Sequence, residues 1–237
     1  MGVTNNLKST TALLIVSVLL LGCNLSKLRP GGSSSAGNDS PSRSGTAFRP
    51  SSDARKDLGD ALRKLKTAYP YRLTEITSAT ANGKTAMPDT KRVVEFAAPD
   101  RSHMKWTGGM GSDMEEITIG EKRYWYADGK WSESAGRSAE EKARTGAELE
   151  KKLAEATKEV NYVGAETVGG VPCFAYTYSL EMNVEGHAYT GTGKAWIGAA
   201  DGLPHQIDAD FKVSVYGHKS HIVYEYNVDI KVEKPIL

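Results

Sequence analysis

The segment Gly191-Thr192-Gly193-Lys194 comes nearest to a phosphate-binding loop in this sequence. A Walker motif would also need Gly at position 188 and Ser or Thr at position 195, and both positions hold alanine. The dinucleotide fingerprint fails as well, because it needs Gly at position 196, which is Trp196. Without a phosphate to cradle, these glycines predict a bend in a β-strand.

Other residues that could support catalysis lack the partners they need. His218 and His221 offer two imidazoles, but no carboxylate pair or helical HExxH segment accompanies them, so we interpret them as exposed turn residues. Cys173 lies in an alternating run over residues 172–180, which favours a small strand residue over a nucleophile. No serine stands in a nucleophile elbow. The sequence therefore predicts no enzyme activity, no metal site and no catalytic residue.

A different chemistry is expected at Cys23, which ends an apolar run over residues 11–23. A membrane-spanning helix needs about 20 apolar residues, whereas a secretory signal has an apolar region of about 7–15 after a basic start. The ending Leu20-Leu21-Gly22-Cys23 resembles the lipobox of bacterial lipoproteins. This resemblance implies cleavage after Gly22 and covalent diacylglycerol and N-acyl groups on Cys23, with no other cofactor. The alternative is an ordinary signal peptide with a cysteine nearby.

The charge balance and the cysteine count exclude some partners. Lys8 is the only charged residue among the first 22, so the chain from Cys23 onward has 29 basic and 29 acidic residues. A neutral chain lacks the basic surface that nucleic acid would need, and no nucleic-acid partner is expected. If Cys23 is acylated, Cys173 has no partner for an intramolecular disulfide.

Composition divides the chain into three parts. Residues 1–22 form the predicted lipoprotein signal peptide. Residues 23–52 are rich in Ser, Gly and Pro and predict a flexible tether, because they contain too few apolar side chains to offset the entropy of ordering. Residues 53–237 are expected to form a single domain.

The hydrophobic pattern of that domain predicts an α+β fold. Apolar residues at three- and four-residue spacing predict a helix over residues 54–69, capped by Ser or Asp and ended by Pro70. A second helix is expected over residues 138–157, where Ser138 and Glu141 fit a capping box. Alternation elsewhere predicts antiparallel strands, each with one solvated face. The expected strands cover residues 71–78, 92–98, 101–107, 115–119, 123–127, 160–168, 173–184, 187–197, 206–216 and 220–233, with Trp131 completing the first half.

Several phrases, in this order, resemble the LolA/LolB-like family of lipoprotein-localisation carriers and related lipid-binding lipoproteins. They are residues 93–101 (VVEFAAPDR), 116–126 (EITIGEKRYWY) with 129–131 (GKW), Trp196-Ile197 with Gly202-Leu203-Pro204, and residues 226–230 (YNVDI). The resemblance implies a strongly curved antiparallel sheet, an unclosed barrel, with helices covering the concave face and acyl chains held on that apolar face. Unlike the soluble periplasmic carrier, this chain would be lipid-anchored, like the outer-membrane acceptor.

The resemblance leads to two hypotheses. The first is a membrane-anchored lipoprotein that binds a lipid or acyl chain in a hydrophobic cleft, as carrier, acceptor or sensor. The second is a protein-interaction or signalling module of the cell envelope with the same fold and no lipid cargo, using strand edges and the turn at residues 108–111. Asn24 is not the Asp that resembles a retention signal in some bacteria, which favours the outer membrane, facing the periplasm.

The candidate cleft residues are the large apolar side chains of the predicted strands, for which an ordinary core is the alternative interpretation. They are Val94, Phe96, Met104, Trp106, Ile117, Ile119, Trp125, Phe174, Tyr176, Tyr178, Ile222, Tyr224 and Tyr226.

Overall fold

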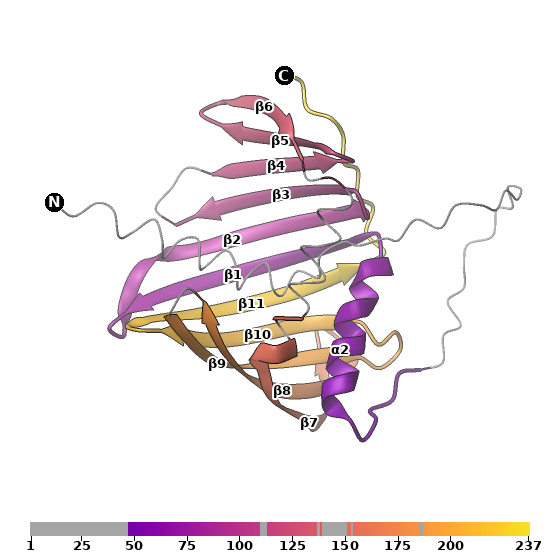
Figure 1. Ribbon diagram of the computed structural model, residues 1–237. Helices are drawn as coiled ribbons and strands as arrows, with labels where there is room; N and C mark the ends of the chain where they lie inside the picture. Colours follow the sequence, from indigo (N-terminus) through magenta and orange to yellow (C-terminus); the bar gives the residue numbers. More distant parts are fainter. Residues whose placement is uncertain (1–46, 110–112, 137, 139–150, 153, 185–186) are drawn as a thin grey trace, which may run out of the picture.

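The computed structural model describes residues 47–109, 113–136, 138, 151–152, 154–184 and 187–237. Helix α2 (Ala54–Lys64) continues into the short 3-10 helix η1 (Leu65–Thr67) and lies on one side of a large sheet (Figure 1). The strands are β1 (Tyr71–Ala81), β2 (Lys84–Ala98), β3 (Arg101–Gly108), β4 (Met114–Ile119), β5 (Lys122–Ala127), β6 (Lys130–Ala135), β7 (Thr157–Val168), β8 (Val171–Val184), β9 (His187–Gly198), β10 (Pro204–Val213) and β11 (Tyr216–Tyr226).

All eleven strands belong to one antiparallel sheet with the order β6-β5-β4-β3-β2-β1-β11-β10-β9-β8-β7. Two series of hairpins, β1 to β6 and β7 to β11, join where β1 pairs with β11. Strands β6 and β7 follow each other in the chain but form the two opposite edges, so the sheet curls without closing (Figure 1). The prediction of an unclosed antiparallel sheet is confirmed.

Helix α2 forms where the sequence predicts it. The Asp53 carboxylate caps its start by accepting a hydrogen bond from the Lys56 amide at 2.9 Å. Leu58 and Ala61, together with Leu65 of η1, give the helix a buried apolar stripe, because this spacing places them on one face.

The sheet surface beneath α2, here called the helix-bearing face, forms the main core. The paired residues Leu73 and Tyr224 mark this face at the junction of β1 and β11, and Tyr176 marks it on β8. Alternate residues of these strands are buried, as expected for strands with one covered face. The buried members of this core are Leu58, Ala61, Leu65, Ala68, Tyr71, Leu73, Val94, Ala156, Tyr176, Tyr178, Leu180, Ala195, Ile197, Leu203, Ile207, Ile222 and Tyr224.

The predicted strand over residues 206–216 is too long. Strand β10 ends at Val213, and Ser214 adopts a positive φ of 54° in the turn to β11. Tyr216 therefore belongs to β11 rather than to β10. A serine does not predict a left-handed conformation, and the alternating pattern continues through this turn, so the sequence predicted one longer strand.

The last predicted strand, over residues 220–233, is also wrong at its end. Strand β11 stops at Tyr226, because Asn227 adopts a φ of 57°. Residues 227–237 form no strand and run along the ends of the strands towards β6 (Figure 1). Val232 is buried against the sheet in this segment. An extended chain lying on a surface alternates like a strand, which explains the prediction.

Two strands of the first half exceed their predictions. The predicted strand over residues 92–98 is only the second half of β2, whose first half contains Pro88. The register with β1 shifts between Met87 and Thr90, and such an irregularity tolerates proline within a sheet. Trp131 likewise lies within a full strand, β6.

Some predictions lie outside the described residues. These are the signal peptide, Cys23, most of the tether and most of the helix over residues 138–157, of which residues 151–152 and 154–156 are described and helical. Coverage of the sheet by two helices therefore stays a prediction, and α2 is the helix that the described residues place on it. None of the helices in the described ranges is long and apolar enough to cross a membrane.

Candidate functional site

The strand register shows which predicted cleft residues share a face. Pairing connects Tyr71 with both Phe96 and Tyr226, and it connects Val94 with Met104. Continuing this register across the sheet places all but two of the predicted residues on the helix-bearing face: Val94, Phe96, Met104, Trp106, Trp125, Phe174, Tyr176, Tyr178, Ile222, Tyr224 and Tyr226.

Ile117 and Ile119 are the two exceptions. They lie on the opposite face of β4, where Ile117 packs with Tyr124 and with Val232 of the C-terminal segment. This part of the sheet has apolar residues on both faces. Apolar character alone could therefore not show which side chains of β4 lie on the helix-bearing face. The two isoleucines therefore do not join the other cleft residues.

The remaining candidates divide into two groups by burial. Val94, Tyr176, Tyr178, Ile222 and Tyr224 are buried in the core around α2. The others are only partly buried, namely Phe96, Met104, Trp106, Trp125, Phe174 and Tyr226. The side chains of the first group belong to the core, whereas those of the second group keep part of their apolar surface exposed.

Strands β3, β4 and β5 extend this apolar surface away from the helix. Trp106, Trp125 and Met114 lie there on the helix-bearing face, and Met114 is 38% exposed. The guanidinium of Arg123 stacks 3.9 Å from the centre of the Trp125 ring, while its Nη2 lies 2.7 Å from the Glu116 carboxylate. The charges of Arg123 and Glu116 on this strip are thus paired with each other.

A buried polar cluster interrupts the apolar face in the middle of the sheet. Glu75 of β1 forms an ion pair with Arg92 of β2, and their side chains are only 3% and 6% exposed. Ser220 of β11 donates a hydrogen bond of 2.6 Å to Glu75. This cluster links three adjacent strands, and no sequence motif predicted it.

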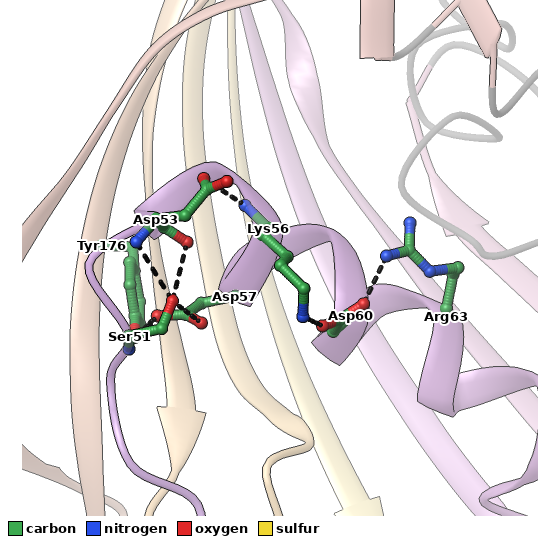
Figure 2. A network of polar contacts seen from close by, with 7 residues as sticks. All are labelled: Ser51, Asp53, Lys56, Asp57, Asp60, Arg63 and Tyr176. Carbon is green, nitrogen blue, oxygen red and sulfur yellow. Dashed lines mark hydrogen bonds and ion pairs between the residues drawn. The ribbon is translucent and has the colours of Figure 1, made fainter.

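A second polar network fixes the start of the domain (Figure 2). The buried Asp57 carboxylate accepts hydrogen bonds from the amide and hydroxyl of Ser51, at 2.8 and 2.7 Å, and from the Tyr176 hydroxyl at 3.1 Å. Nearby, the Phe48 amide donates to the Ala199 carbonyl at 2.9 Å. Residues 47–52, which the sequence assigns to the tether, are therefore bound to the domain.

An open groove of about 770 Å³ lies on the face opposite the helix. Polar side chains of β1 and β7–β11 line it, including the ion pairs His221–Asp208 at 2.6 Å and Lys219–Asp210 at 3.6 Å. The sequence analysis did not find this groove, because its residues come together only through strand pairing. Its charged lining does not suit an acyl chain.

The residues considered for catalysis do not assemble into a site. His218 and His221 lie within β11 and not in a turn; His218 is buried on the helix-bearing face, whereas His221 faces the other side. Burial raises the pKa of the Cys173 thiol to about 11, which disfavours a nucleophilic thiolate. No group of three or more potential metal ligands occurs within the described residues.

The glycines of β9 allow neighbouring residues to approach the strand closely, and they do not mark a bend in it. The register of β9 with β8 and β10 is regular at Gly191 and Gly193. A side chain at Gly193 would overlap the ring of Tyr178, which lies across it. In the other glycine segment, Gly108 and Gly109 adopt positive φ angles, and residues 110–112 lie outside the described ranges.

No family model and no curated protein matches this sequence. The structure is similar to that of the lipoprotein LppX from Mycobacterium tuberculosis, with a TM-score of 0.48 and 11% identity over 76% of this chain and 98% of the other. LprF from Mycobacterium bovis gives a TM-score of 0.48 and 12% identity over 78% and 98%. The LolA superfamily protein NE2245 from Nitrosomonas europaea gives 0.36 and 8% over 75% and 94%. The matches thus include a member of the LolA superfamily, the family that the sequence resembles.

Proposed function

We propose that this chain is a lipid-anchored protein outside the cytoplasm that binds a lipid or acyl chain on the helix-bearing face of its sheet. It would act as a carrier, acceptor or sensor and not as an enzyme. The lipobox-like ending at Cys23 supports the anchor, and Asn24 favours the outer membrane, facing the periplasm.

The observation that carries this proposal is the difference in size between the sheet and its helix. Eleven residues of α2 span about 16 Å, whereas eleven strands extend over about 48 Å. The helix contacts β7 and β9, while Trp106, Met114 and Trp125 lie far from these strands on the same face. A long, flexible acyl chain suits such a surface, because burying apolar area contributes about 25 cal/mol per Å².

The binding test uses protein purified without added lipid, examined by native mass spectrometry and by organic extraction. We expect a bound lipid that Trp106→Ala reduces severalfold, because this ring lies on the helix-bearing face. Trp131→Ala is the matched control, since Trp131 is also partly buried but pairs with Tyr126 on the opposite face.

A protein that carries no lipid and does not take up fluorescent fatty acids would contradict this proposal. In that case, a stable envelope partner captured by crosslinking would support the protein-interaction module instead. Mass analysis of Cys23 tests the anchor separately, because acylation adds the mass of the diacylglycerol and N-acyl groups to the mature N-terminus.

A further inference from the structure

A row of small residues crosses the helix-bearing face in the middle of the sheet. Gly193, Ala209, Ser220 and Thr77 are paired in sequence across β9, β10, β11 and β1. Tyr178 of β8 pairs with Gly193 at the end of this row. The Tyr178 ring lies across Gly193, so its hydroxyl lies over this glycine, at the end of the row.

Two polar side chains, Tyr178 at the end of this row and His218 in the adjacent row, lack a hydrogen-bond partner among the described residues. The Tyr178 hydroxyl and the His218 Nδ1 make no hydrogen bond within the part of the chain that the structure describes. Both side chains are more than nine-tenths buried, with exposures of 7% and 6%. His218 stacks on Phe211 in the next row, and its ring centre lies 5.2 Å from that of Phe211. A buried polar group that is left unpaired destabilises the fold, so such groups indicate a missing partner.

The charges around this row are already balanced. Arg92 forms its ion pair with Glu75, which also accepts the hydrogen bond from Ser220. Burial lowers the pKa of His218, so its ring is neutral at pH 7. The row can therefore offer hydrogen bonds, but it offers no free positive charge to a carboxylate or phosphate.

From these contacts we infer that the row from Tyr178 to Thr77 holds the uncharged polar part of the ligand, an ester or hydroxyl group, with the hydrocarbon on the apolar strip beside it. The Tyr178 hydroxyl and His218 supply its hydrogen bonds. This inference rests on the proposed function and names its ligand class: a neutral acyl ester or alcohol is preferred to a free fatty acid.

The experiment titrates the full chain, in a non-ionic detergent at pH 7.5, with three probes and measures binding by native mass spectrometry. The probes are 1-monooleoylglycerol, oleate and 1-octadecene. We expect monooleoylglycerol to bind the wild type most tightly. Tyr178→Phe should weaken this binding about five- to tenfold, the effect of one lost hydrogen bond, and leave octadecene binding unchanged.

Tyr176→Phe is the matched control, because Tyr176 lies on the same strand and face but its hydroxyl already donates to Asp57. This control should leave monooleoylglycerol binding unchanged. The melting temperature of Tyr178→Phe should be equal to or above that of the wild type, because the variant removes an unpaired buried group.

The remaining outcomes separate the two proposals. Equal binding of monooleoylglycerol to the wild type and Tyr178→Phe, or tighter binding of oleate, would overturn the inference and leave lipid binding intact. If the wild type bound none of the three probes, the proposed function itself would be overturned.

Discussion

The contact between Tyr178 and Gly193 shows how a single missing side chain shapes this sheet. The tyrosine ring occupies the space that a Cβ at Gly193 would fill. We expect Gly193→Ala to lower the free energy of unfolding by about 1–3 kcal/mol in urea titrations, because the ring must leave its position. Gly59→Ala in α2 is the control, because an added Cβ would meet the flexible Arg63 side chain at 3.3 Å or more. It should raise stability by up to about 1 kcal/mol, because alanine favours helix. An unchanged free energy of unfolding in Gly193→Ala would show that the Tyr178 ring is free to move.

His218 should make the stability of the protein depend on pH. Burial lowers its pKa in the folded state below the ordinary value of 6.5. Below about pH 6.5 the unfolded chain therefore binds a proton that the folded chain refuses, so stability falls as pH falls. The loss is at most about 1.4 kcal/mol per pH unit and stops once the folded imidazole also becomes protonated.

The measurement is urea unfolding at pH 7.5 and pH 5.5 for the wild type and for His218→Phe, which keeps a ring against Phe211. We expect the variant to lose less stability between these two pH values than the wild type. The exposed His187, changed to Gln, should behave like the wild type. Identical pH dependence in His218→Phe would mean that other groups cause the effect.

At the scale of elements, strong local patterns predicted most of the fold. Helix α2 has a cap, an apolar stripe and a following proline, and most strands alternate clearly. The errors arose where a non-glycine residue adopts a left-handed conformation, as Ser214 and Asn227 do, or where proline enters a strand at an irregular register, as Pro88 does. Serine gives no signal for such a turn. Asparagine tolerates a left-handed conformation and proline indicates an irregular strand, but at Asn227 and Pro88 the surrounding pattern was followed instead.

The same reasoning explains which site residues could be predicted. Large apolar residues at alternate positions were found, but the side of the sheet that each occupies depends on register. Ile117 and Ile119 therefore appeared equivalent to the other candidates, although they face the C-terminal segment. The unpaired hydroxyl of Tyr178 and the imidazole of His218 could not be recognised at all, because hydrogen bonding depends on neighbours that are distant in sequence.

The C-terminal segment over residues 227–237 should contribute to stability although it forms no strand. Val232 is buried with Ile117 and Tyr124. We expect Val232→Ala to lower the free energy of unfolding by about 1.5 kcal/mol, at about 0.8 kcal/mol per buried methylene. Ile236→Ala is the control and should change stability by less than about 0.5 kcal/mol, because Ile236 is 94% exposed. Equal effects of the two variants would contradict the packing seen here.

At the scale of the whole molecule, the sheet is a single body because β1 pairs with β2 on one side and with β11 on the other. The residues joined by the second pairing are far apart in the sequence, such as Glu75 and Ile222. No local signal predicts the pairing of β1 with β11, since each series of hairpins would satisfy the same alternating pattern by itself. The cluster of Glu75, Arg92 and Ser220 spans both pairings at this position.

Glu75→Gln should therefore destabilise the whole sheet, by about 3–5 kcal/mol in urea unfolding, because it leaves the buried Arg92 charge without its carboxylate. Glu75→Leu combined with Arg92→Met should cost less, since apolar residues remove both charges together. The control is Glu95→Gln, which breaks the Arg72–Glu95 pair at 2.7 Å between the same two strands on the opposite, more exposed face. There we expect at most about 1 kcal/mol. If Glu75→Gln and Glu95→Gln lowered the free energy of unfolding equally, burial of the Glu75–Arg92 pair would have no energetic consequence. The junction of β1 with β2 and β11 would then depend on backbone pairing alone.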